Sequence, residues 1–199
     1  MYTVDSRKAC AMRIDWEEEL DERLVQRMER GEGLAFAALA TRYWNLVHRI
    51  CSNLLPPAGE AREATEEIFL EIPLLAGAFP SDVPFKTSLL KVALRRILIR
   101  RRLAAAPGEG SVEGLPARFD RRPVRERIRD ALRHLHELDH AAFVLREVEG
   151  IPRQEVAAIL EIPPQSVSQR THRATLSLTG ALRDLVSPAA SSGQVGYAS

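Results

Sequence analysis

The fold is decided by the stretch GIPRQEVAAILEIPPQSVSQRTHRA, which occupies residues 150–174. Val156, Ile159 and Leu160 repeat at helical spacing, so this part predicts a short helix with one apolar face. The segment EIPP at residues 161–164 interrupts that pattern, and a proline suits the first turn of a new helix. We therefore predict two helices joined by a tight turn, in which Glu161 adopts a positive φ angle.

The second of these helices has two unlike faces. Val167, Thr171, Ala174 and Leu178 share one helical period and are predicted to point inward. The other side carries polar and basic residues that can donate hydrogen bonds to base edges and phosphates, namely Gln165, Ser166, Gln169, Arg170 and Arg173. A polar second helix after a short turn is the helix-turn-helix arrangement. An ordinary helical hairpin with a solvated polar face is the alternative interpretation.

The position of each residue on this helix predicts its role in binding DNA. Residues near the N-terminus of a recognition helix reach base edges, and later residues reach the backbone. Gln165 and Gln169 are therefore assigned to base reading, since glutamine can pair bidentately with adenine. Arg170 either reads guanine or holds a phosphate, because periodicity leaves its side ambiguous. Arg173, together with Arg153 on the first helix, is predicted to contact phosphate.

Composition limits the classes of protein that fit the chain. It has 199 residues, with 28 Lys and Arg against 27 Asp and Glu, so its composition is globular and its net charge is only +1. Any binding to nucleic acid has to come from local patches. Without a membrane-length apolar run or a signal core, the sequence favours a cytoplasmic protein without membrane insertion. Cys10 and Cys51 lack metal spacing and favour a reducing compartment or no redox role.

The sequence carries no motif for catalysis or cofactor binding. It contains no Gly-rich phosphate loop and no nucleophile beside a base. Three of its five histidines, His134, His136 and His140, lie close together, but the first two point to different helix faces. We therefore predict a protein that is not an enzyme and that binds neither metal nor cofactor.

The chain is predicted to be all-α, because no segment alternates with period two long enough to form a strand. The predicted organisation is a helical domain over 15–104, a flexible linker over 105–122, a second helical domain over 123–186 and a disordered tail over 187–199. In the first domain we expect four helices. The first begins at Trp16, the second covers 34–55, and the fourth covers 84–103. The third begins near Glu60 and is expected to end or kink at Pro73. In the second, helices over 124–138 and 139–149, the latter with Asp139 as N-cap, precede the helix-turn-helix.

Two helices of the first domain carry opposite charge. The helix over 84–103 presents several cations and no acid, namely Lys91, Arg95, Arg96, Arg100, Arg101 and Arg102. Its predicted inward residues are Phe85, Leu89, Val92, Ala93 and Ile99. The preceding helix has an acidic face formed by Glu63, Glu66, Glu67 and Glu71. The basic cluster favours a polyanion partner, and a solvated face is the alternative.

Together, in their order and spacing, these segments resemble bacterial RNA polymerase sigma factors of the small extracytoplasmic-function (ECF) type in the sigma-70 family. The resemblance covers about residues 24–185. It is carried by RGEGLAF at 30–36, EAREATEEIFL at 60–70, PFKTSLLKVA at 84–93, LDHAAFVLREVEGI at 138–151, the helix-turn-helix and RTHRA at 170–174.

The resemblance implies a promoter-specificity subunit whose partners are core RNA polymerase and promoter DNA, with an anti-sigma factor as a further candidate partner. The first domain would dock on polymerase through Glu63, Glu66 and Glu67. It would contact the −10 element through residues of the basic helix, namely Lys86, Thr87, Arg95, Arg96, Arg100 and Arg101. The second domain would read the −35 element through Arg153, Gln165, Ser166, Gln169, Arg170 and Arg173.

The chain departs from the family pattern mostly in the first domain. Pro73 and Ser88 stand where tryptophans are usual, and Arg95 and Ile99 stand where the −10 helix usually has Asn and Asp. Glu66 replaces the usual glutamine of the docking segment, and in the second domain Glu161 replaces the usual turn glycine. The resemblance therefore supports −35 binding better than −10 recognition. Two alternatives stay open: a helix-turn-helix regulator that acts without polymerase, and a sigma-like protein that binds polymerase or an anti-sigma partner without melting DNA.

Overall fold

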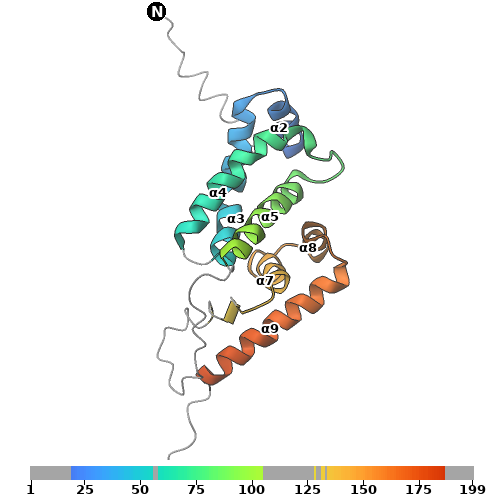
Figure 1. The fold of residues 1–199 in the computed structure, drawn as a ribbon. Coiled ribbons are helices and arrows are strands. Elements are labelled where there is room, and N and C mark those ends of the chain that lie inside the picture. The colour runs from blue at the N-terminus through green and yellow to red at the C-terminus, as the bar shows by residue number, and fades with distance from the viewer. Residues whose placement is uncertain (1–18, 56–57, 105–127, 129–130, 133, 187–199) are drawn as a thin grey trace, which may run out of the picture.

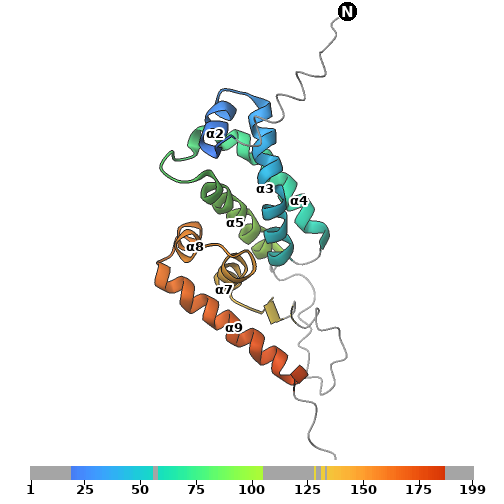
Figure 2. The ribbon, with the colours of Figure 1, turned by 180° about the vertical axis from the view of Figure 1, so that it is seen from behind.

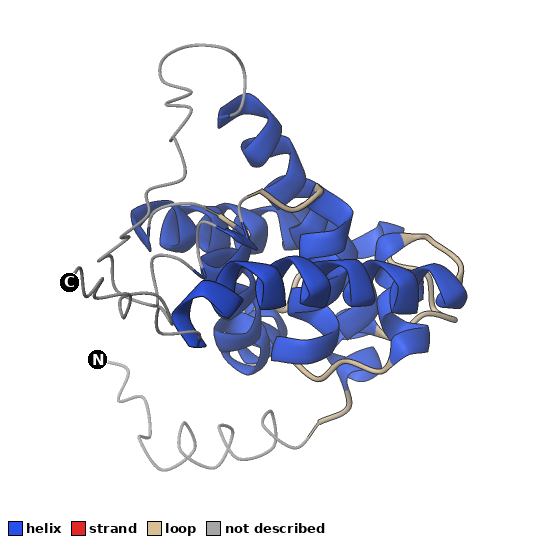
Figure 3. Cartoon of the chain, turned by 90° about the horizontal axis from the view of Figure 1, so that it is seen from below, coloured by secondary structure: helices blue, strands red, loops and turns tan. Residues whose placement is uncertain are grey.

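The computed structural model describes residues 19–55, 58–104, 128, 131–132 and 134–186, and this part of the chain consists of helices and loops without a strand (Figures 1 and 3). The predicted all-α class is confirmed. The elements are α2 (Asp21–Glu29), α3 (Gly33–Leu54), α4 (Ala58–Glu71), the 3-10 helix η1 (Ile72–Ala78), α5 (Phe85–Ala104), α7 (Glu137–Phe143), the π-helix η2 (Val144–Val148), α8 (Arg153–Leu160) and α9 (Pro164–Val186). Trp16, Cys10, the predicted linker and the predicted tail lie outside the described residues.

The first half, α2 to α5, is built around the apolar faces of its three longer helices. Leu39 and Ile50 of α3, Ile68 of α4 and Leu89 and Ile97 of α5 are each at most 1% exposed. Pro73 falls at the change from α4 to η1, where a residue without an amide proton breaks the α-helical ladder as predicted. Ile99 was wrongly predicted to point inward. Its side chain is 43% exposed, because the buried stripe of α5 continues through Ile97 instead.

The second half begins differently from the prediction. The helix at 137 is capped by His136, whose Nδ1 accepts a hydrogen bond from the amide of Leu138. Asp139 is therefore not the N-cap. It lies in the first turn with 6% of its surface exposed. The predicted single helix over 139–149 is an α-helical part, α7, continued by the π-helix η2.

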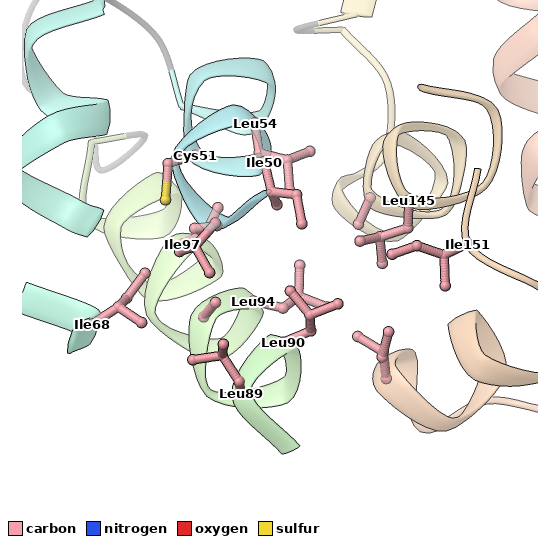
Figure 4. Packing of buried hydrophobic residues seen from close by; sticks show 14 of the residues in the cluster. Ile50, Cys51, Leu54, Ile68, Leu89, Leu90, Leu94, Ile97, Leu145 and Ile151 are labelled. Carbon is pink, nitrogen blue, oxygen red and sulfur yellow. The ribbon is translucent and has the colours of Figure 1, made fainter. Parts of the chain in front are cut away.

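The two halves pack directly against each other, with α5 beside α7 and α8 and with α9 on the far side (Figures 1 and 2). Ile50, Leu90 and Leu94 of the first half face Leu145 and Ile151 of the second (Figure 4). Each of these five side chains is at most 5% exposed, and the buried residues of both halves form one continuous cluster. Among the described helices, none is long and apolar enough to cross a membrane.

Candidate nucleic-acid interface

The helix-turn-helix is formed by α8, the turn at 161–163 and α9. Val156, Ile159 and Leu160 of α8 are buried, as predicted. The turn is made by Glu161, whose φ of 55° lies in the left-handed region, and by an amide bond from Ile162 to the carbonyl of Ala157 at 3.1 Å. The predicted positive φ is confirmed. A side chain with a Cβ is strained in this conformation, which glycine adopts without cost.

Glu161→Gly is therefore expected to stabilise the chain. Relief of the left-handed strain outweighs the greater freedom of glycine in the unfolded state, for a net gain of roughly 0.5–1 kcal/mol in the free energy of unfolding. Urea denaturation followed by circular dichroism measures the change. Glu161→Ala is the control, because it removes the same carboxylate but keeps the Cβ. Equal stability of the two variants would contradict this account of the turn.

The inner, apolar face of α9 is formed by the four residues that were predicted to point inward. Val167, Thr171, Ala174 and Leu178 are at most 9% exposed. Gln165, Gln169 and Arg173 lie on the exposed surface, and Ser166 is half-buried. At 100° per residue, His172 lies on the same outward side as Gln165 and Gln169. Sequence reasoning missed His172 as a candidate DNA contact, although the same helical wheel places it there.

Arg170 does not lie on that outward side. Its Nη1 donates to Oδ1 of Asp139 at 2.8 Å, and the side chain is 21% exposed. Arg173 reaches the same carboxylate from Nε at 2.9 Å and from Nη2 at 2.8 Å, while more than half of its side chain stays exposed. The prediction that Arg170 reads a base is thus not supported by its position. Arg170 links α9 to α7, whereas more than half of the Arg173 side chain remains exposed to solvent.

Basic side chains also line a hollow of about 420 Å³ formed by η2, the first residue of α8 and α9. Arg153, Arg146 and His172 border it together with the hydroxyl-bearing residues Ser168, Thr171 and Thr175. The hydroxyls of Thr171 and Thr175 already donate to the carbonyls of Val167 and Thr171, and Glu147 also lines the hollow, so the donors left for a phosphate oxygen are Arg146, Arg153, His172 and Ser168. Arg146, whose Nη1 also donates to the carbonyl of Ile151 at 3.3 Å, is a second candidate that the sequence analysis did not name.

The cations of α5 are nearly all engaged within the chain. Lys86 pairs with Glu155 of α8 at 3.1 Å, and Arg101 donates to Nδ1 of His140 at 2.9 Å. Thr87 is 4% exposed, so its predicted contact with DNA is excluded in this conformation by its burial inside the first half. Arg95, by contrast, lies on the exposed surface and borders two cavities of about 190 Å³ each along α5.

The acidic face of α4 meets the other side of α5. Glu67 accepts from Arg100 at 2.6 Å, and Glu63 lies 3.7 Å from the same guanidinium. Arg96 pairs with Glu71 at 2.5 Å, which lowers the pKa of that carboxyl. The structure therefore brings the predicted polymerase-binding acids next to the predicted DNA-binding arginines. Glu66 pairs along its own helix, with Arg62 at 2.9 Å.

One of the two cavities along α5 has an apolar wall and a basic rim. Leu75, Phe79 and Val83 form the wall, and Lys91 and Arg95 lie on the rim. Glu161 reaches this rim from the helix-turn-helix and lies 3.7 Å from Lys91. In the described part of the chain, no group of three or more His, Cys, Asp or Glu residues is placed to hold a metal ion.

These features define an all-helical protein with a helix-turn-helix whose second helix presents polar and basic side chains to solvent. The model of the family described as sigma-70, region 4 matches residues 125–178, which include α7, η2, α8 and most of α9. For this part of the chain, the resemblance stated from the sequence is confirmed: residues 125–178 are similar to region 4 of the sigma-70 family.

Whole-chain relatives support the same assignment. The RNA polymerase sigma-H factor of Pseudomonas aeruginosa is 27% identical over 189 residues, which cover 85% of this chain and 97% of the relative. The ECF RNA polymerase sigma-E factor of Escherichia coli K12 is 24% identical over 186 residues, covering 83% and 96%. The similarity therefore extends through both halves and is not confined to the helix-turn-helix.

Two solved structures share the fold. CnrH, in complex with the cytosolic domain of CnrY, has a TM-score of 0.65 and 20% identity, covering 85% of this chain and 100% of that one. The sigma factor RpoE from Bartonella quintana, in complex with the anti-sigma factor NepR, has a TM-score of 0.56 and 16% identity, covering 74% and 96%. At these identities the likeness concerns the fold alone.

Proposed function

We propose that the chain is an RNA polymerase sigma factor that directs core polymerase to specific promoters. The observation that carries the proposal is the sigma-70 region 4 match over the helix-turn-helix, within a similarity to named sigma factors that spans both halves. Sigma factors are specificity subunits, so the chain acts by binding and not by catalysis. We place it in the cytoplasm, where it would meet core polymerase.

The two halves have different tasks in this proposal. The recognition helix α9 enters the major groove of the −35 element, with Gln165 and Gln169 at base edges and Arg173 and Arg153 at phosphates. The first half docks on polymerase through Glu63, Glu66 and Glu67, and α5 contacts DNA near the −10 element. The cavity beside α5 offers an apolar wall and a basic rim to an unpaired base, which offsets part of the cost of unpairing.

An anti-sigma factor is a further proposed partner. Two proteins that share this fold, CnrH and RpoE, were solved in complex with CnrY and with NepR, the latter named an anti-sigma factor. The present chain has the same overall arrangement of helices. Co-purification of the tagged chain from its own cells, followed by identification of the bound proteins by mass spectrometry, would identify such a partner.

Run-off transcription with reconstituted holoenzyme tests the proposed function. Core polymerase mixed with the purified chain is expected to transcribe a subset of genomic fragments that core alone leaves silent. Binding to core without transcription would favour the sigma-like interaction protein. DNA binding without any affinity for core would favour a helix-turn-helix regulator. The reason to test these two alternatives is that the first half departs from the family pattern at four positions, namely Pro73, Ser88, Arg95 and Ile99.

Substitutions on α9 should separate base reading from phosphate binding. A Gln165→Ala/Gln169→Ala variant is expected to change the preferred −35 sequence, at a cost of roughly 1–3 kcal/mol per base pair read. Arg173→Ala should instead weaken all sequences about equally. Selection from a randomised −35 library, with holoenzyme made from each variant, measures both effects. An unchanged preferred sequence in the double variant would show that this helix is not the reader.

A further inference from the structure

One carboxylate of α7 is shared between two arginines of α9. Oδ1 of Asp139 accepts from Nη1 of Arg170 at 2.8 Å and from Nη2 of Arg173 at 2.8 Å, while Oδ2 accepts from Nε of Arg173 at 2.9 Å. Two oxygens therefore hold the guanidinium of Arg173 along its Nε–Nη2 edge, which is the bidentate arrangement. The cluster lies where α7 packs on α9 (Figures 1 and 2).

The three members of this cluster differ in their exposure to solvent. The side chain of Asp139 is 8% exposed and that of Arg170 is 21% exposed, whereas that of Arg173 is 56% exposed. A guanidinium group carries five N–H donors, and Asp139 takes two of those on Arg173. The remaining donors, on Nη1 and on the outer side of Nη2, belong to the edge opposite the carboxylate.

The place of Arg173 on the helix suits a contact beside the bases. At 100° per residue, Arg173 lies about 40° around α9 from Gln169, on the flank that carries α7. The hollow bordered by Ser168 and Thr175 lies on the opposite flank. A helix in the major groove has one DNA strand on each side. Under the proposed function, on which this step rests, Arg173 faces the backbone of one of these strands.

We propose that Asp139 is a positioning residue for DNA binding, which holds Arg173 by one edge and presents its other edge to a phosphate beside the recognition helix. Asp139 does not itself touch DNA, because its carboxylate is buried behind the two arginines. A free arginine loses side-chain entropy when it binds a phosphate, and Arg173 has already lost part of it in the folded chain. The hydrogen bonds from Arg173 and then Arg170 lower the pKa of Asp139, so its carboxylate is ionised at neutral pH.

The opposite role for Asp139 is that of a competitor, which Arg173 has to leave before it can reach DNA. Asp139→Asn separates the two roles by the sign of its effect. Asparagine keeps one acceptor oxygen for Arg170, but its amide group is a donor, so it cannot hold both Nε and Nη2 of Arg173. Loss of a positioning group weakens DNA binding, whereas loss of a competing negative charge strengthens it.

Fluorescence anisotropy of the full chain with a 20-base-pair duplex of arbitrary sequence measures this sign, since binding without sequence preference rests on phosphate contacts. Asp139→Asn is expected to bind about fivefold more weakly than the wild type at low salt. Glu147→Gln is the control of equal charge, because it removes one carboxylate from the opposite flank of α9. It should bind at least as tightly as the wild type. Wild-type or tighter binding by Asp139→Asn would overturn the proposal.

A second pair of variants covers the case in which Asp139→Asn does not fold. Arg173→Lys and Arg173→Ala change an exposed side chain and leave Asp139 paired with Arg170. Lysine keeps the positive charge but has no planar edge for a carboxylate to hold. If positioning matters, both variants should bind about tenfold more weakly than the wild type. Near wild-type binding by Arg173→Lys would show that the charge alone suffices, and the proposal would fail.

A double-mutant cycle distinguishes positioning from a general effect on the fold. In the Arg173→Ala background, Asp139→Asn should cause no further loss of affinity, because the group that it positions is already absent. A further fivefold loss there would mean that Asp139 acts through the packing of α7 on α9, against the proposal. None of these measurements uses polymerase, so their failure and a failed run-off assay remain distinct results.

Discussion

Asp139→Ala is expected to lower the free energy of unfolding by about 3–5 kcal/mol, because it leaves the largely buried guanidinium group of Arg170 without its carboxylate and also removes the partner of Arg173. The carboxylate of Asp139 is 8% exposed and accepts from Arg170 and twice from Arg173, all at 2.8–2.9 Å. It is thus the main polar link between α7 and α9. Nε of Arg170 already has no hydrogen-bond partner in the described structure, so the loss of Asp139 leaves that side chain still less satisfied.

Urea denaturation of the full chain at pH 7 measures this loss, and Arg173→Ala is the matched control. Arg173 is more than half exposed, and Asp139 keeps its hydrogen bond from Arg170 when Arg173 is removed. Arg173→Ala should therefore lower the free energy of unfolding by less than Asp139→Ala does. The hydrogen bonds from Arg173, then those from Arg170, lower the pKa of Asp139 below its ordinary 3.8. Its contribution is therefore complete above pH 3.8 and lost only as the pH falls further. A loss below 1 kcal/mol for Asp139→Ala would refute this role.

The helix-turn-helix could be predicted from the sequence because its determinants are local. The apolar spacing of Val156, Ile159 and Leu160 and the prolines at 163 and 164 act within a few residues. The positive φ of Glu161 follows from the same short turn. Periodicity likewise identified the inner face of α9, since four buried positions share one helical period. What is decided within one helix or one turn is visible in the sequence.

The partners of the charged residues could not be predicted, because they are set by packing between segments that lie far apart in the chain. Arg170 lies at the border of two helix faces, and only the position of Asp139 on α7 decides that it turns inward. The acids of α4 and the arginines of α5 were assigned to two different partners, yet Glu67 and Arg100 bind each other. Periodicity describes one helix by itself and says nothing about the charges of its neighbours.

The direct packing of the two halves was also absent from the sequence prediction. A segment rich in Ala, Pro and Gly between helical regions indicates a linker, and a linker suggests independent domains. Leu90 and Leu94, however, lie on the side of α5 that meets the second half, and they are as buried as the residues that face α3 and α4. The continuous buried stripe around much of α5 was the available signal, because a helix that is apolar on several sides has several neighbours.

His140 gives the second large expected effect, a loss of stability in mild acid. Its side chain is 3% exposed and accepts from Arg101 at Nδ1, which leaves its own proton on Nε2, where it has no partner in the described structure. Burial, with the positive charge of Arg101, lowers the pKa of His140 from 6.5 to about 4. His140 is therefore protonated in the unfolded chain below about pH 6.5, whereas in the folded chain it is protonated only below about pH 4. Stability should fall by about 2 kcal/mol between pH 7 and pH 5.

Urea denaturation at half-unit steps from pH 7 to pH 5 measures this slope, and His140→Gln is the matched variant. Glutamine keeps an acceptor for Arg101 but does not titrate, so the slope over this range should largely disappear even if the variant is less stable at pH 7. His172→Gln is the control, because His172 lies on the exposed side of α9 and its replacement should leave the slope as in the wild type. A slope that persists unchanged in His140→Gln would mean that another group is responsible.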